Sequence, residues 1–218
     1  MLDGAGASTA LDVIDERSKD KLLNKNTQKI SKCAEQKIDD NSQKLPFDQL
    51  ARDQKRNDRK QVVFIDSQVQ DYQTLINAFN KDTEVYLIQS SEDGFKKIDK
   101  VLKNDQEISS LHIIGHGSAG KILFGNATLS NDTIQSYNQT LRSIGQSLTE
   151  DGDILFYGCN VASTEGGKTL ISKISEITKA DIAASDDVTG KGGDWDLEKK
   201  IGIVETKNVR VVGYLSLI

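Results

Sequence analysis

The 218-residue sequence has only two cysteines, one proline, one tryptophan and no long apolar run. Two cysteines, Cys33 and Cys159, are too few for the disulfide framework of a small secreted domain. We expect no bridge between them, because nothing in the sequence pins the polar segment around Cys33 to the apolar run before Cys159. No window approaches the roughly 18 consecutive apolar residues of a membrane span, and no signal-peptide pattern is visible at the N-terminus. We therefore expect a soluble chain without a membrane span.

Clustered basic residues are also missing. Residues 1–61 carry 13 Lys and Arg against 11 Asp and Glu, whereas residues 62–218 carry 15 against 22, so the net charges are +2 and −7. Nucleic acids and anionic membranes bind clustered Lys and Arg, which displace condensed counterions. The sequence therefore indicates no nucleic-acid partner.

The composition divides the chain into two parts. Residues 1–61 are rich in Lys, Asp, Asn and Gln, contain the only proline, Pro46, and approach the composition of disordered segments. We predict that they form a polar N-terminal arm or linker, partly helical or disordered. Residues 62–218 alternate short apolar runs with segments of helical periodicity, and we predict that they form one domain.

The alternation predicts an α/β fold. Strands are expected at 62–66, 85–88, 111–114, 154–157 and 181–184. Helices are expected around 72–79, 95–102, 130–148 and 167–178, with Ser130 or Asn131 as the N-cap of the third. Strands that alternate with helices imply a mostly parallel sheet with helices on both faces, a three-layer sandwich. The sequence after Gly190 predicts further strands, which we expect to close the sheet as an antiparallel edge.

A glycine-rich stretch follows the third predicted strand. Gly115, Gly117 and Gly120 have the spacing of a dinucleotide-binding turn, but such a turn opens a helix. The residues after Gly120 predict a short strand or turn instead, and Lys121 is not followed by the Ser or Thr of a phosphate-binding loop. We therefore expect no nucleotide and no other cofactor.

What remains is a histidine and a cysteine at two strand ends. His116 follows the third predicted strand and Cys159 follows the fourth, with one long helix predicted between them, as a right-handed crossover between neighbouring parallel strands requires. Sites in such folds lie at the carboxyl ends of the strands. A nearby imidazole stabilises a thiolate nucleophile and later protonates the leaving amine. Gly117 and Gly158 would allow close backbone approach at the two turns.

Each residue has a plainer interpretation alone. His116 could cap its turn, and Cys159 could be a buried small apolar residue, but their pairing at strand ends favours catalysis. His112 lies inside the strand and is expected to be a packed residue. A metal site from His116, Cys159 and Asp186 lacks further ligands at motif spacing, so no metal is predicted.

Two motifs carry a resemblance to caspase-like (clan CD) cysteine peptidases. An apolar block that ends in His-Gly, "LHIIGHG", precedes an apolar block that ends in Gly-Cys, "DILFYGC". The resemblance implies a caspase-like fold, His116 as general acid and base, Cys159 as nucleophile, and an oxyanion hole from the N–H groups of Gly117 and Cys159. It implies a cysteine endopeptidase that acts on a polypeptide, with its own chain as the substrate in cis. The basic cluster of an inositol-phosphate activation site is not visible.

The resemblance also concerns the acidic loop "AASDDVTG". In such peptidases the loop after the corresponding strand helps to form the pocket for the residue before the scissile bond, so Asp186 or Asp187 would select a basic side chain. A solvated acidic loop is an equally good interpretation. Trp195 is interpreted as a packing residue, with a pocket wall as the alternative.

A closer resemblance covers roughly residues 62–205. "VVFIDSQVQDYQTLI", "HIIGHGSAGKILFGNATL" and "ADIAASDDVTGKGGDWDLE" are similar to a domain-of-unknown-function family (four-three-four-seven) found near the start of giant bacterial adhesins and RTX-type surface proteins. The opening "MLDGAGASTA" resembles the tail of a leader motif. This resemblance implies an exported or cell-surface protein with a surface or secretion-system partner, and it leaves open a catalytically silent module for secretion, retention or adhesion.

Overall fold

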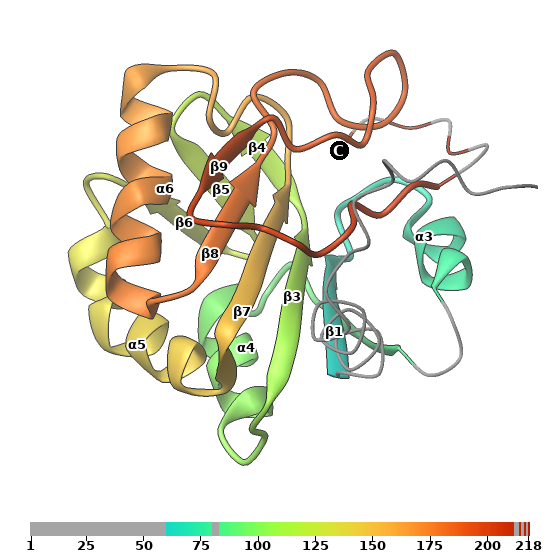
Figure 1. Ribbon diagram of the computed structural model, residues 1–218. Helices are drawn as coiled ribbons and strands as arrows, with labels where there is room; N and C mark the ends of the chain where they lie inside the picture. The colour runs from blue at the N-terminus through green and yellow to red at the C-terminus, as the bar shows by residue number, and fades with distance from the viewer. Residues whose placement is uncertain (1–59, 80–82, 212–213, 215, 217) are drawn as a thin grey trace, which may run out of the picture. The chain divides into compact units, whose positions relative to one another are not determined.

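A six-stranded sheet forms the centre of the domain in the computed structural model (Figure 1). Its strand order is β2-β1-β3-β7-β8-β9, with the first five strands parallel and β9 antiparallel to β8. The strands are β1 (Lys60–Asp66), β2 (Glu84–Ile88), β3 (Ile108–Ile114), β7 (Leu148–Tyr157), β8 (Asp181–Ala184) and β9 (Lys199–Ile201). The predicted mostly parallel sheet with an antiparallel edge is confirmed.

The structure describes residues 60–79, 83–211, 214, 216 and 218, all within one compact unit of residues 51–218. β1 begins at Lys60, two residues before the predicted start of the domain. The rest of the predicted arm, with Pro46 and Cys33, lies outside the described residues and stays a prediction. Among the residues described, no helix has the length and apolar character needed to cross a membrane.

Helices lie on both faces of the sheet (Figure 1). They are α3 (Tyr72–Ala78), α4 (Gly94–Leu102), α5 (Asn138–Gln146) and α6 (Glu165–Thr178). Phe64 of β1 belongs to the buried cluster shared with α4, α5 and α6, whereas Ile65 belongs to the cluster on the opposite face with Leu75 of α3. Successive strand residues point to opposite faces, so β1 must be apolar on both. That requirement explains its continuous apolar run.

The prediction of a helix over 130–148 is wrong for the first half of that segment. The chain after β3 forms a separate antiparallel sheet of β4 (His116–Ser118), β5 (Lys121–Phe124) and β6 (Ala127–Ser130). A 3₁₀ turn, η1 (Ile134–Tyr137), then leads into α5. Ser130 therefore ends a strand, and the Asn131 side chain donates a hydrogen bond to Gly166 O at 2.8 Å, so neither caps a helix. The Thr133 hydroxyl holds the turn, because it accepts from Ser130 N at 2.9 Å and donates to Thr128 O at 2.7 Å.

The last part of the described chain contains less strand than predicted. β9 supplies the antiparallel edge, but residues 203–211 contain neither strand nor helix. They cover the face opposite α4, α5 and α6, where Val211 belongs to the same apolar cluster as Tyr157 and Val204 and Val209 pack against it. This face is therefore closed partly by an extended segment and only partly by helix α3.

Candidate functional site

The carboxyl ends of β3 and β7 are joined directly. Ile114 pairs with Tyr157, and Gly115 N donates to Tyr157 O at 3.1 Å. The two turns that follow are in contact, because a Cβ atom on Gly117 would lie 2.7 Å from Cys159 O. A Cβ atom on Gly158 would lie 3.0 Å from Gly115 O. The structure thus brings the His-Gly and Gly-Cys turns together, and glycine is what permits their close approach.

His116 is half-buried at the start of β4, and its ring is oriented by a backbone group. Its Nε2 atom lies 3.2 Å from the carbonyl oxygen of Gln68, 48 residues earlier in the sequence. A carbonyl oxygen only accepts, so Nε2 carries the proton in this contact. In the neutral ring Nδ1 is then the basic nitrogen. The contact fixes a tautomer that suits proton abstraction.

A buried carboxylate holds the Gln68 carbonyl in place. Asp66, the last residue of β1, is 1% exposed; its Oδ1 accepts from Gln68 N at 2.8 Å and its Oδ2 from Gly125 N at 2.6 Å. The Gln68 side chain donates to Gly125 O at 3.0 Å. Sequence reasoning missed both Asp66 and Gln68. The sequence did contain one signal for Asp66: an aspartate that ends an apolar strand lies at the same edge of the sheet as His116.

The half-buried thiol of Cys159 has two backbone neighbours. Thr189 N–H donates to Sγ at 3.4 Å, and Thr189 itself is fully buried. The thiol can donate its own proton to a backbone oxygen of Ile218, 2.6 Å from Sγ, or to Thr189 O at 3.8 Å. An N–H directed at sulfur stabilises a thiolate. Thr189 was not singled out from the sequence, because a backbone donor leaves no side-chain signal.

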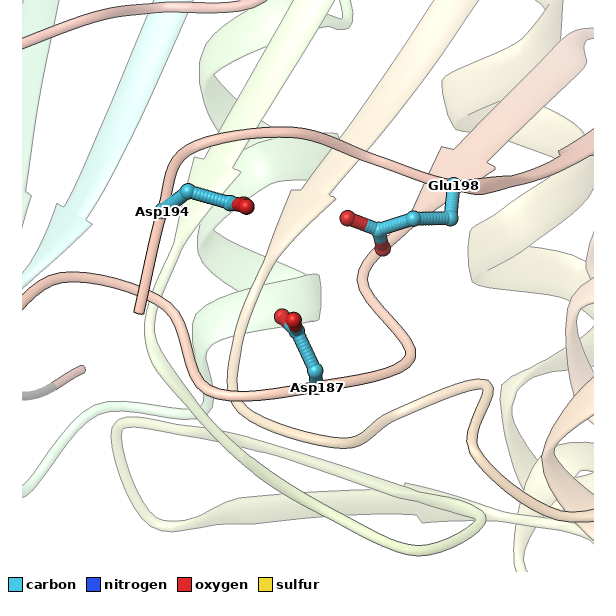
Figure 2. Close-up of side chains that lie close together, drawn as sticks. All are labelled: Asp187, Asp194 and Glu198. Carbon is cyan, nitrogen blue, oxygen red and sulfur yellow. The ribbon is translucent and has the colours of Figure 1, made fainter. Parts of the chain in front are cut away.

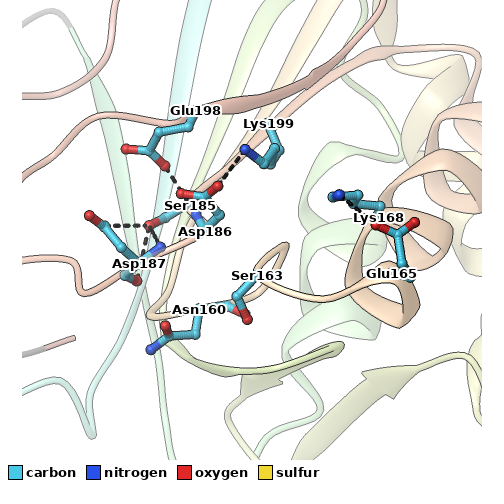
Figure 3. A network of polar contacts seen from close by, with 9 residues as sticks. All are labelled: Asn160, Ser163, Glu165, Lys168, Ser185, Asp186, Asp187, Glu198 and Lys199. Carbon is cyan, nitrogen blue, oxygen red and sulfur yellow. Dashed lines mark hydrogen bonds and ion pairs between the residues drawn. The ribbon is translucent and has the colours of Figure 1, made fainter.

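The chain after Cys159 is tied to the loop after β8. Asn160 has a left-handed backbone with φ 59°, and its N–H donates to Asp187 O at 2.6 Å. Ala162 N donates to Ser185 O at 2.9 Å, and the Ser163 hydroxyl donates to Asn160 O at 2.8 Å. Figure 3 shows these two loops side by side. The position of the thiol therefore depends on the acidic loop.

The two aspartates expected to bind substrate have partners within the domain. Asp186 forms an ion pair with Lys199 of β9, and this hydrogen bond holds the pKa of Asp186 below its usual value (Figure 3). Asp186 N donates to Glu198 Oε2 at 3.0 Å. Asp187 Oδ1 lies 3.3 Å from the Ser185 hydroxyl. Asp186 thus stabilises the β8–β9 edge, and selection of a basic side chain by either aspartate stays a prediction.

Three carboxylates gather beside this loop. Asp187, Asp194 and Glu198 each offer one oxygen within 4.8 Å of the other two, and Figure 2 shows them directed toward one another. Desolvation, with like charge from Asp187 and Asp186, raises the pKa of Glu198. Carboxylate oxygens suit Ca²⁺ or Mg²⁺. All three residues are exposed, however, and exposed acidic groups are common without an ion.

His112 is a packed residue, as expected. It is 2% exposed, its ring stacks on Tyr157, and burial lowers the pKa of His112 to about 4. The Tyr157 hydroxyl accepts from Val209 N at 2.9 Å, so its own proton can be donated to His112 Nδ1 at 3.3 Å. The proton of the neutral ring then lies on Nε2, which donates to Ser110 Oγ at 3.3 Å.

Trp195 is half-buried among aromatic rings. Its ring centroid lies 6.0 Å from that of Tyr157 and 5.5 Å from that of Tyr214. These contacts favour the interpretation of Trp195 as a packing residue.

Comparison with known proteins places the chain in a family. A family model described as a domain of unknown function (DUF4347) matches residues 62–212. No curated protein matches the chain. Solved structures that resemble part of it include one described as a small-chain dehydrogenase, with 9% identity, a TM-score of 0.27, and coverage of 55% of this chain and 72% of that chain. A likeness this weak carries no argument about activity. Because the family model spans more than half of the sequence, the protein belongs to the DUF4347 family.

Proposed function

We propose that this domain is a cysteine-dependent peptidase in which Cys159 is the nucleophile and His116 the general acid and base. The observation that carries the proposal is the contact between the two turns at the ends of β3 and β7. This contact brings together the backbones that bear the imidazole and the thiol, at the edge of the sheet where α/β proteins bind ligands.

The contacts of both residues support nucleophilic catalysis. The Gln68 carbonyl fixes a proton on His116 Nε2, so Nδ1 is free to take the thiol proton. The Thr189 N–H, 3.4 Å from Sγ, would stabilise the resulting thiolate. A thiolate attacks a peptide carbonyl, and the N–H groups of Gly117 and Cys159 would bind the oxyanion. The protonated imidazole then donates its proton to the leaving amine, and water hydrolyses the thioester.

The wider role follows from the sequence resemblances. The likeness to caspase-like peptidases makes a polypeptide substrate in cis, and thus self-processing, part of the proposal. The likeness to domains near the start of giant adhesins and RTX-type proteins adds that the domain is part of an exported or cell-surface bacterial protein, with a surface or secretion-system partner. The reaction as proposed uses only protein groups and water.

A second candidate is a catalytically silent module for secretion, retention or adhesion within a giant adhesin. One observation favours it: the half-buried Cys159 thiol is already hydrogen-bonded to backbone groups of Thr189 and Ile218, which occupy part of its surroundings. The two candidates share the fold and differ in whether the thiol reacts.

The test is processing of a longer natural chain that contains this domain, followed by intact-mass spectrometry. Cys159→Ala is expected to abolish processing, whereas Cys33→Ala, a change of the same chemistry in the predicted arm, is expected to leave it unchanged. Equal processing in the wild type and the Cys159→Ala variant would contradict the peptidase assignment and favour the silent module.

A further inference from the structure

A hollow of about 370 Å³ lies between two helices that cover one face of the sheet. α5 and α6 are side by side there (Figure 1), and both bury apolar residues in the cluster on that face. The residues of α6 that line the hollow belong to its last two turns, which lead toward the start of β8 at Asp181. The hollow therefore lies near the amino ends of the strands, away from the turns that carry His116 and Cys159.

Positive charge is concentrated in this hollow. It is lined by Arg142 of α5, Lys173 of α6 and Lys179, which directly follows α6, together with one acidic residue, Glu176. Three cations and one carboxylate leave an excess of two positive charges, whereas residues 62–218 as a whole have a net charge of −7. Within the described part of the chain, none of the three cations forms an ion pair. The hollow therefore attracts an anion.

Two of the cations are held by neutral amide oxygens rather than by carboxylates. Arg142 Nε donates to Asn138 Oδ1 at 2.8 Å, and Lys173 Nζ donates to Asn131 Oδ1 at 3.0 Å. The Asn131 amide is itself fixed, because its nitrogen donates to Gly166 O at 2.8 Å. An amide oxygen orients a cation without neutralising its charge, and the guanidinium and the ammonium keep their other N–H donors. Both cations are therefore oriented and available to a ligand.

The remaining groups of the hollow favour a carboxylate next to an apolar group. Ile134 and the half-buried Ile177 contribute apolar surface. The Nε atom of Arg142 is taken by Asn138, so its two terminal nitrogens remain for the parallel pair of hydrogen bonds that a carboxylate accepts. Glu176 repels anions of high charge density, such as polyphosphates, more strongly than it repels a single carboxylate. The ligand that fits is therefore an acidic group beside an apolar one.

The hollow suits part of a polypeptide better than a free small molecule. Its volume is at the lower end of the roughly 300–1,000 Å³ of pockets that enclose a whole ligand. Gln135, Arg142 and Lys179 are exposed at its rim. A ligand would thus be covered on one side only, as a docked polypeptide segment is.

We infer that this hollow is a docking site for an acidic segment of a partner polypeptide. Arg142 and Lys173 bind a Glu or Asp carboxylate of the partner, and Ile177 packs against the neighbouring apolar side chain. Lys179 at the rim adds attraction at longer range. Neither member of the dyad takes part, so the inference is independent of the proposed peptidase function.

The first experiment measures binding of a fluorescein-labelled peptide of alternating leucine and glutamate to the full chain by fluorescence anisotropy. The same peptide with glutamine in place of glutamate is expected to bind about tenfold more weakly or worse. Arg142→Gln and Lys173→Gln are each expected to weaken binding of the acidic peptide about tenfold, because each removes a charge-assisted hydrogen bond. Lys168→Gln makes the same change in α6 outside the hollow, and it is expected to leave the dissociation constant unchanged.

A second variant is expected to act in the opposite direction. Glu176→Gln removes the carboxylate that lines the hollow, so the acidic peptide should bind about threefold more tightly. A variant that merely loses structure cannot bind more tightly, so this result separates a change of charge from a folding defect. Glu165→Gln, the same substitution at an exposed residue at the start of α6, should leave binding unchanged.

Four results would overturn the inference. They are equal binding of the glutamate and glutamine peptides, a dissociation constant for the acidic peptide weaker than about 1 mM, displacement of the peptide by pyrophosphate at a lower concentration than by glutarate, and displacement by glutarate as readily as by unlabelled peptide. The third result would identify a phosphate site, and the fourth a site for a free small acid. None of these measurements involves Cys159, so the peptidase proposal is tested separately.

Discussion

The carbonyl oxygen of Gln68 lies 3.2 Å from Nε2 of His116, although the residues are 48 positions apart in the sequence. The carbonyl is held by Asp66, which accepts from the Gln68 N–H at the end of β1. Two segments thus act together on one imidazole: the turn after β1 supplies the carbonyl that orients the ring, and β4, which directly follows β3, supplies the ring itself. The proposed dyad therefore depends on a third segment that contains no obvious catalytic residue.

Asp66→Asn tests this arrangement. The amide nitrogen would face Gln68 N or Gly125 N, both donors, so we expect a loss of about 1–3 kcal/mol in the free energy of unfolding. We also expect the pH dependence of Cys159 alkylation to shift toward that of a free thiol, a change that lowered stability alone would not produce. Asp132→Asn, the same substitution at an exposed residue in the turn after β6, should change neither quantity. An unaltered pH profile in Asp66→Asn would show that Asp66 has no positioning role.

Gly117→Ala tests the contact between the two turns. The new methyl group would lie 2.7 Å from Cys159 O and from Gly158 C, both backbone atoms, so the turns must separate. We expect a destabilisation of about 1–3 kcal/mol by urea unfolding. Gly166→Ala, within α6, is the matched control. Its methyl group would lie 3.8 Å from Thr164 Oγ1, an ordinary contact, so the substitution should be neutral or slightly stabilising. Equal effects of the two variants would mean that the turns do not need their close contact.

The backbone of Asn160 predicts a difference between two substitutions at one site. Its φ of 59° is easy for glycine and costly for a β-branched residue. We expect Asn160→Val to lower the free energy of unfolding by about 1–2 kcal/mol and Asn160→Gly to change it by much less. The midpoint temperatures of thermal unfolding of the two variants measure this difference. Equal midpoints would contradict a left-handed backbone at the residue after Cys159.

Burial of His112 predicts a pH dependence of stability. Its pKa falls from an ordinary 6.5 to about 4 on folding, so the unfolded chain binds more protons between these values and stability falls as the pH is lowered through this window. The contribution is about 2–3 kcal/mol by pH 4.5. Urea unfolding at pH 7.5 and 4.5 measures it. His112→Gln removes the titrating group, and the variant should lose that part of the pH dependence. An identical pH dependence in both proteins would show that His112 is not held neutral.

The sequence predicted the sheet well because its strands carry their own signal. β1 is apolar on both faces, and β3 ends in Ile113 and Ile114, which belong to the clusters on opposite faces of the sheet. The ends of β3 and β7 could be placed together from the crossover between them. The segment 130–148 was mispredicted, since a short strand that ends at Ser130 and a turn held by Thr133 depend on hydrogen bonds to Thr128 rather than on periodicity.

The candidate site shows the same division between side-chain and backbone signals. His116 and Cys159 were found because their side chains are chemically distinctive and follow apolar runs. The groups that orient them were not found: Gln68 acts through its carbonyl, Thr189 through its N–H, and any residue type has these groups. Ile218 likewise contacts the thiol through its backbone, which no sequence pattern marks.

The central claim is that His116 activates Cys159, and the most direct measurement is the alkylation rate of Cys159 from about pH 5 to 9 in the wild type and in His116→Ala. The account predicts that Cys159 reacts as a thiolate well below the pH of about 8.5 at which a free cysteine ionises, and that this advantage disappears in His116→Ala. If Cys159 follows the profile of Cys33 in every variant, the dyad is not assembled and the peptidase proposal is contradicted.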